Sequence, residues 1–514
     1  YICSVFILGG MTSCEDFLDK REDVGLTEDD IFRDYYSLRG FLDQSFNQLE
    51  NVMVMDNWEN GRAFVGLFAD EMATTDNSSA VFTLHSGNWL SNAKSNKTFE
   101  IGNAGSTAIS RSYKALRINN RIINDIDKAP LTPEQKNEIL GQAYFYRSWF
   151  YFQIIKRYGG MPIIDKVFEG GDDDIPRMTY HESHDWMMED IQKAIYMLPD
   201  SWDDPNYGRP TKIAAMALKE WAQLFDASPL MQNDLNSTEN KGYDTERAKS
   251  AAKSAYEVIR YMDGSKSAPY PYGLASKEEY TNVFYFKYPP VHQPEYIWVK
   301  RQFPNAANQN QKRTIRTFWQ YEDLAFGSGP DGNSMCCPSL NIVNMFDKKG
   351  ADGIYYPIDD PRSGYALDYD HKPFEDRDPR FYNNILLPGT TWGHYADGRT
   401  YYITTYKGGA AYQHMLTQKD CNKRMFTGFM CKKFMWPECN QYLEKNNPNC
   451  WWDYRFLTIY IRASQIYLDY AEALFEGCGS ATATIEGCPI SAAEAINILR
   501  RRIGLTDLPS DIVA

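Results

Sequence analysis

Residues 132–162, TPEQKNEILGQAYFYRSWFYFQIIKRYGGMP, contain the strongest helix signal in this chain of 514 residues. Thr132 is a suitable N-cap, proline follows at the first helical position, and Gln135 completes a capping box. The Gly-Gly pair at 159–160 then ends the helix. Apolar residues extend almost all round its axis, so we expect burial on more than one side; among them are Ala143, Tyr146, Phe150 and Ile154.

Similar helix starts occur on both sides of this stretch. Capping residues precede apolar periodic segments at Thr27 with Asp30, Thr179 with Glu182, Thr211, and Asp244 or Thr245. The residues expected to face inward are Ile31, Leu38, Leu42 and Leu49; Met187, Ile191, Ala194 and Leu198; and Ala248, Ala251, Ala252, Ala255 and Val258. Small inward residues with short connections are typical of tetratricopeptide-like helix pairs. The sequence therefore predicts a mostly α-helical superhelix of such pairs over residues 27–261.

The composition and the secondary-structure signals change in residues 262–455. This region holds 15 of the 25 prolines and six of the 12 tryptophans, and it offers only short strands, at 296–299 and 401–404. Helical order returns in 456–514, where Ser491 with Glu494 predicts a capping box. In the preceding helix we expect Ile461, Ser464, Leu468, Ala471 and Phe475 to face inward and Gln465, Asp469, Glu472 and Glu476 to face outward. We therefore expect a large loop-rich, aromatic-rich insert between two helical regions.

Charge and composition narrow the function classes. The chain has 54 Lys and Arg against 68 Asp and Glu, a net charge of −14, and no basic block, which excludes a nucleic-acid partner. It is rich in aromatic residues, with 12 Trp, 36 Tyr and 27 Phe. Exposed Tyr and Trp side chains are typical of stacking surfaces for flat ligands.

The N-terminus indicates export. Residues 1–13, YICSVFILGGMTS, are apolar with small residues before Cys14, as in a lipoprotein signal segment, and residues 14–26 suit a polar tether. We expect Cys14 to be lipidated; the alternative is a buried N-terminal strand. Eight further cysteines permit disulfides, of which Cys478 with Cys488 is the best single guess. Their spacings do not suit zinc, and we expect no metal and no cofactor.

Several segments together resemble the SusD/RagB family of outer-membrane nutrient-uptake lipoproteins of Bacteroidetes. They are the Cys14 lipobox and residues 138–164, 208–230, 338–353, 377–389, 459–476 and 491–505. The family usually continues with a segment of the type ERxxEL…EGxRxxDLxRW, so we expect this chain to be cut at both ends. The resemblance implies a non-enzymatic protein on the cell outer membrane, lipid-anchored and surface-exposed. It also implies an oligosaccharide or polysaccharide ligand and a SusC-like TonB-dependent transporter as partner.

Candidate glycan contacts come from local chemistry, because sugar rings need exposed aromatic planes beside planar polar groups. Three loop clusters supply both: Asn88 and Trp89; Arg316, Trp319, Gln320 and Tyr321; and Trp392 with His394 and Tyr395. The residues expected to contact the glycan are Asn88, Trp89, Arg316, Trp319, Tyr321 and Trp392. For each tryptophan the alternative is core packing. Trp149 and Trp221 lie within helices, so we expect them in the core.

Other motifs have structural interpretations. Gly327 to Gly332 matches G-x-G-x-x-G without a strand or helix beside it, which indicates a turn. His181 to His184 is not H-E-x-x-H and suits helix capping, Asp172 to Asp174 suits a solvated loop, and Arg377 to Arg380 suits a turn fixed by charge pairing. Two rival functions stay open. They are a helical-toroid glycoside hydrolase, which needs a carboxylate pair, and a tetratricopeptide-type scaffold that binds a protein.

Overall fold

The computed structural model describes residues 27–49, 69–73, 108–167, 174–233, 239, 241–284, 293–301, 337–366, 372–394, 400–409, 427–433 and 457–514. Its helices are α2 Glu28–Phe32, α3 Tyr35–Gln48, α6 Ala108–Asp125, α7 Pro133–Tyr158, α8 Tyr180–Met197, α9 Lys212–Ala227, α10 Thr245–Gly264, α13 Leu340–Asn344, α14 Pro379–Asn384, α16 Ala463–Cys478, α17 Ala492–Arg502 and α18 Ser510–Val513. Its strands are β1 Met72–Ala73, β2 Tyr296–Arg301, β3 Cys337–Pro338, β4 Lys348–Lys349, β5 Tyr355–Tyr356, β6 Ile385–Leu386, β7 Thr391–His394, β8 Thr400–Tyr402, β9 Met430–Cys431 and β10 Leu457–Arg462.

The predicted helix caps are present. Thr27, Thr132 and Thr179 each form a reciprocal capping box with the residue three positions later. Thr211 and Asp244 cap α9 and α10 through their side-chain oxygens. Ser491 caps α17 in the same way, but the predicted capping box does not form, because the Glu494 carboxylate pairs with Arg501 at 2.5 Å. These bonds satisfy backbone N–H groups that a helix leaves without partners, so these capping residues determine where their helices begin.

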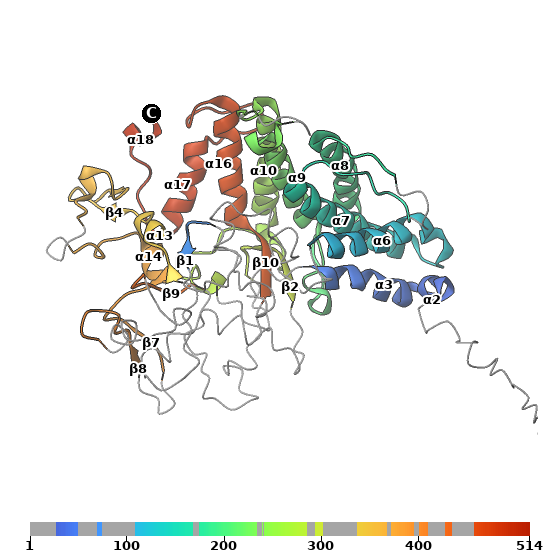
Figure 1. Ribbon diagram of the computed structural model, residues 1–514, viewed down its shortest axis with the longest axis horizontal. Coiled ribbons are helices and arrows are strands. Elements are labelled where there is room, and N and C mark those ends of the chain that lie inside the picture. Colours follow the sequence, from blue (N-terminus) through green and yellow to red (C-terminus); the bar gives the residue numbers. More distant parts are fainter. Residues whose placement is uncertain are drawn as a thin grey trace, which may run out of the picture.

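The helices stack in chain order and form the predicted superhelix (Figure 1). Each of α3, α6, α7, α8, α9 and α10 packs against the next, and α16 returns after the loop-rich region to pack between α10 and α17. At the centre, α7 is buried on nearly every side from Ile139 to Ile155, as its apolar sequence predicts. The mostly α-helical, tetratricopeptide-like fold with short strands is therefore confirmed.

An aromatic cluster joins the helices to the strands. The ring of Trp298 on β2 lies 4.8 Å from Phe145, 4.7 Å from Trp149 and 4.6 Å from Tyr460, measured between ring centres. The Trp298 indole also donates a hydrogen bond to the carbonyl of Gly208. Trp149 is buried and Trp221 packs beside it, so both helical tryptophans belong to the core as predicted.

A buried ion pair ties α7 to α8. Arg147 donates to both carboxylate oxygens of Asp190, at 2.5 and 2.8 Å, and to Asn120 on α6 at 3.0 Å. Such a bidentate pair is favourable inside a protein only when its remaining polar atoms are also bonded. The pair therefore fixes how three neighbouring helices align.

The structure differs from the sequence-based expectations in three details of helix extent and orientation. The N-terminal helical segment is broken between α2 and α3, because Asp34 caps a new helix by accepting from the Ser37 N–H at 2.8 Å. At the other end, residues 457–462 form β10 and pair antiparallel with β2, so α16 begins only at Ala463. Packing against α10 and α17 turns Ile466, Tyr467, Tyr470 and Leu474 inward. Leu468 and Phe475 are instead 48% and 45% exposed.

The proposed Cys478–Cys488 disulfide is also wrong, since both are free thiols in the structure. The Cys488 side chain is buried with its sulfur 4.0 Å from the carbonyl oxygen of Ala252 on α10. A backbone bridge between Ile485 and Cys488 closes the loop instead. Among the helices of the described ranges, none is both long and apolar enough to cross a membrane.

Candidate functional site

The structure describes only part of the predicted glycan site. Trp392 lies on β7. Five other predicted contacts and the predicted lipidation site lie outside the described residues: Asn88, Trp89, Arg316, Trp319, Tyr321 and Cys14. The segments that carry them can be placed only through the described residues that flank them.

The described residues that flank two of these segments lie beside each other, where β1 pairs with β3. Strand β1 pairs antiparallel with β3, so that Met72 lies opposite Pro338 and Ala73 opposite Cys337. The Ser339 N–H donates to the carbonyl of Glu71 at 3.0 Å and extends this pairing. The chain leaves β1 toward Asn88 and Trp89, and it enters β3 from the segment that contains Arg316, Trp319 and Tyr321.

The third predicted cluster starts from the same place. Strand β3 contacts β9, and β9 pairs with β6, with Ile385 opposite Cys431 and Leu386 opposite Met430. Strand β7, which carries Trp392, begins five residues after β6. We call the group β1, β3, β6 and β9 the strand junction. It gathers the flanks of all three predicted aromatic clusters.

The interior of the strand junction is buried, and its thiol groups are poorly suited to catalysis. Cys337 and Cys431 are buried free thiols, and burial raises the pKa of Cys431 to about 12. Burial also lowers the pKa of Lys433 to about 8, and its ammonium lies 4.6 Å from the centre of the Phe284 ring. A thiol with a raised pKa stays protonated and is a poor nucleophile. The junction therefore suits a packing role.

A small hydrophobic core packs against the strand junction. Val343, Phe346, Phe381 and Ile385 form it, with Arg377 buried beside them. The Arg377 guanidinium donates to the carbonyls of Val343 and Phe346 at 2.6 and 2.7 Å. Asp378 caps α14 and pairs with Arg380 at 2.6 Å. The predicted charge-fixed turn is therefore present at Asp378 and Arg380, whereas Arg377 bonds to backbone carbonyls.

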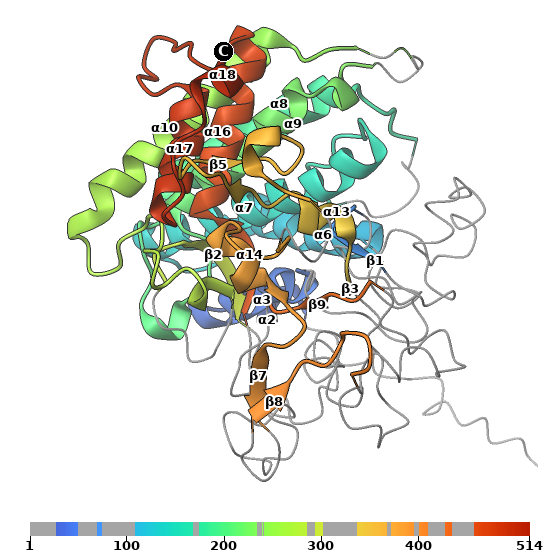
Figure 2. The ribbon, with the colours of Figure 1, turned by 90° about the vertical axis from the view of Figure 1, so that its left-hand side faces the viewer.

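The β7–β8 hairpin projects from the junction, on the side of the molecule away from α16 and α17 (Figures 1 and 2). Tyr402 lies opposite Thr391 in this hairpin and is 60% exposed, while the next residue, Ile403, is buried. Tyr406 is exposed as well. These two tyrosines were not among the predicted contacts, although the alternation of the 401–404 strand could have indicated Tyr402. Exposed tyrosine rings of this kind can stack on sugar rings.

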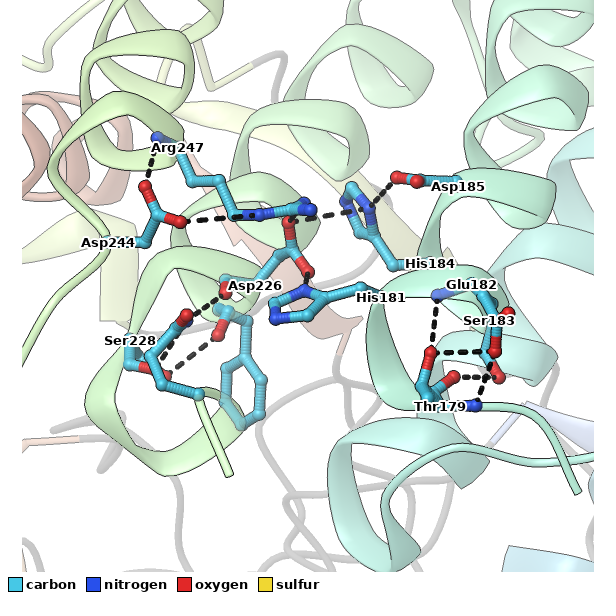
Figure 3. Close-up of polar contacts among 12 residues, drawn as sticks. Thr179, His181, Glu182, Ser183, His184, Asp185, Asp226, Ser228, Asp244 and Arg247 are labelled. Atoms are coloured by element: carbon cyan, nitrogen blue, oxygen red, sulfur yellow. Dashed lines mark hydrogen bonds and ion pairs between the residues drawn. The ribbon is translucent and has the colours of Figure 1, made fainter. Parts of the chain in front are cut away.

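The histidines of α8 take part in a polar network (Figure 3). The His181 Nδ1 lies 2.6 Å from a carboxylate oxygen of Asp226 on α9, and Arg247 on α10 pairs with the other oxygen. The His184 Nδ1 lies 3.1 Å from Asp185 and 3.6 Å from Asp226. Asp226 is buried, so this network links three helices. No group of three or more His, Cys, Asp or Glu suited to a metal ion occurs among the described residues.

Acidic residues matter for the hydrolase alternative. Glu220 on α9 is buried, and both of its carboxyl oxygens lack a hydrogen-bond partner within the described part of the chain. Burial and the neighbouring Asp469 carboxyl raise the pKa of Glu220 well above its ordinary value. Burial likewise raises the pKa of Asp469 to about 7. This pair lies between helices of the scaffold, where a polysaccharide cannot reach Glu220. The motifs at Gly327 to Gly332 and at Asp172 and Asp173 lie outside the described residues.

Known proteins resemble the chain along most of its length. A family model described as starch-binding and associating with the outer membrane matches residues 16–220, and the SusD family model matches residues 294–512. No curated protein matches the sequence significantly.

Solved structures share the fold. A SusD-like protein from Bacteroides fragilis is 21% identical, with 94% of this chain and 81% of that chain covered and a TM-score of 0.67. A laminarin binding SusD-like protein is 17% identical, with 93% and 86% covered and a TM-score of 0.54. Surface glycan-binding protein A from Bacteroides fluxus is 15% identical, with 92% and 82% covered and a TM-score of 0.55. With two family models matched in order along the sequence and this helical scaffold, the chain belongs to the SusD/RagB family.

Proposed function

We propose that this protein captures oligosaccharide at the cell surface and delivers it to a SusC-like TonB-dependent outer-membrane transporter. The observation that carries the proposal is the pairing of β1 with β3, which joins the flanks of the segments bearing Trp89 and Trp319. Trp392 belongs to the adjacent β7–β8 hairpin, which also carries the exposed ring of Tyr402. Names of structural relatives, which include a laminarin binding protein and surface glycan-binding proteins, agree with this role.

The binding residues of this proposal are Asn88, Trp89, Arg316, Trp319, Tyr321 and Trp392. Aromatic rings supply stacking planes for the apolar faces of sugars, and the amide and guanidinium groups bond to hydroxyls. Residues 27–261 form the helical scaffold, 262–455 the loop-rich binding region, and 456–514 the C-terminal helical pair.

The lipid anchor and the transporter belong to the same proposal. Acylation of Cys14, followed by the tether at 14–26, would hold the protein at the outer membrane beside the transporter. In a Bacteroidetes host fed a labelled fatty acid, the unmodified protein should take up the label and Cys14→Ala should not. Equal labelling of the variant would contradict the anchor.

Affinity electrophoresis tests the binding role. The protein starting after Cys14 should be retarded by at least one gel from a panel of neutral and acidic polysaccharides, and Trp89→Ala, Trp319→Ala and Trp392→Ala should each reduce the retardation. Tyr196→Ala is the matched control, since Tyr196 on α8 is 83% exposed and far in sequence from all three clusters. No retardation in any gel would count against glycan binding and favour a peptide ligand.

Catalysis is not part of the proposal. Incubation of the retarded glycan with the protein should release no shorter products, as measured by chromatography of the reducing ends. Product formation would instead favour the hydrolase alternative, which needs an accessible pair of carboxylates.

A further inference from the structure

A second aromatic pocket lies at the scaffold, apart from the strand junction. The connection between α8 and α9, the loop that follows α10, and the start of β2 surround a cavity of about 100 Å³. Its lining includes Trp202, Tyr207, Tyr270, Tyr272, Gln293 and Tyr296. This volume corresponds to about seven to ten water positions, enough for one pyranose ring.

Hydrogen bonds fix the walls of this pocket. The Trp202 indole N–H donates to the carbonyl of Pro210 at 2.8 Å, and the Tyr296 hydroxyl donates to the carbonyl of Val283 at 2.7 Å. The loop that follows α10 is joined to the residues just before β2, because the Gly273 N–H donates to the carbonyl of Pro294 at 3.0 Å. A site whose side chains are already fixed loses little entropy when a ligand binds.

Three groups in the pocket are available to a ligand. Trp202 is half-buried, and within the described residues no aromatic ring or cation stacks on its indole. The hydroxyl of Ser201 and the side-chain amide of Gln293 likewise have no hydrogen-bond partner in the described part of the chain. One free aromatic plane beside one hydroxyl and one amide is the combination that recognises a ring with an apolar face and several hydroxyls.

The charges around the pocket favour a neutral ligand. Arg209 is the one cation among its described lining residues, and its guanidinium is occupied by Asp43 at 2.7 Å and by Gln142 at 2.9 Å. Asp203 and Asp204 directly follow Trp202 and are exposed. An anionic sugar would therefore meet repulsion from these carboxylates, with no unoccupied cation among the described lining residues to offset it.

We propose that this pocket binds a single neutral hexose unit, as a second carbohydrate site on the scaffold. It involves none of the residues proposed for the loop site, so its occupancy does not depend on that site. A glycan held at the loops and a single unit held here would give the protein two separate contacts with carbohydrate.

Saturation-transfer NMR with methyl glycosides of glucose, galactose, mannose and glucuronic acid tests this site. We expect at least one neutral glycoside to bind and the glucuronide to bind more weakly. Trp202→Ala should raise the Kd by about fivefold, because a stacked ring contributes on the order of 1 kcal/mol. Gln293→Ala should weaken binding without touching the packing of Trp202, and Tyr196→Ala should have no effect.

A variant lacking Trp89, Trp319 and Trp392 separates the two sites. Neutral glycoside binding that persists in this triple variant and is lost when Trp202→Ala is added to it supports the scaffold site. Loss of neutral glycoside binding in the triple variant overturns the proposal. Absence of binding by all three neutral glycosides to the unmodified protein also overturns it. Circular dichroism of each variant confirms folding, and if Trp202→Ala is misfolded, Gln293→Ala decides.

Discussion

The acidic pair of buried Glu220 on α9 and half-buried Asp469 on α16 makes the stability of this protein sensitive to pH near neutrality. Burial raises the pKa of Asp469 from its ordinary value of 3.8 to about 7, while the hydrogen bond from Gln465 at 3.1 Å acts in the opposite direction. The folded chain therefore holds a proton on Asp469 over a pH range in which the unfolded chain has released it. Linkage then requires the folded state to lose stability as pH rises from about 4 through about 7.

The expected size of this effect follows from the pKa difference. One pKa unit corresponds to about 1.4 kcal/mol, so the complete change corresponds to about 4 kcal/mol. Between pH 5 and pH 7 the loss should be about 2 kcal/mol, because folded Asp469 changes from almost fully protonated to half ionised while unfolded Asp469 is ionised throughout that range. Asp469→Asn replaces the titratable carboxyl by an amide of nearly the same shape, so it should abolish this part of the pH dependence.

Urea unfolding followed by tryptophan fluorescence at pH 5 and at pH 7.5 measures the effect. We expect Asp469→Asn to be more stable than the unmodified protein at pH 7.5, with a much smaller advantage at pH 5. Glu486→Gln is the control, since Glu486 is exposed and should change the free energy of unfolding little at either pH. If the difference between Asp469→Asn and the unmodified protein is the same at both pH values, the burial argument for Asp469 is refuted.

Three further predictions concern packing. Trp298→Ala removes the ring at the centre of the aromatic cluster and should lower the free energy of unfolding by about 3–5 kcal/mol, measured by urea denaturation; a loss below about 1 kcal/mol would contradict its central role. A Cβ on Gly160 would lie 2.1 Å from the carbonyl oxygen of Met178, so Gly160→Ala should destabilise by about 2 kcal/mol in thermal unfolding. Gly40→Ala, where nothing lies within 4 Å inside α3, should stabilise by about 0.5–1 kcal/mol; equal effects at the two glycines would show the close approach to be wrong. Arg377→Met leaves buried carbonyls without a donor and should cost about 3 kcal/mol, seen as faster amide exchange in α13 and α14; unchanged exchange there would argue against the carbonyl contacts.

The sequence by itself determined the helical scaffold. Capping boxes such as Thr132 with Gln135 and stop signals such as Gly159 act within a few residues, so they can be read without knowing the fold. Gly159 has a φ of 76°, which explains why glycine ends α7. The family segments and their order can likewise be recognised from the sequence alone.

The tertiary structure alone decided which distant groups meet. Residues 457–462 have an apolar pattern that suits either a helix or a strand, and only their pairing with β2 made them a strand. The pairing of β1 with β3 joins residues more than 250 positions apart, and no local signal encodes such a register. Asp469 faces outward in the helical pattern, yet α9 covers it, because the inward face of α16 is set by neighbours on two sides. Local signals fix where elements start and stop, while burial and register depend on packing between elements far apart in the sequence.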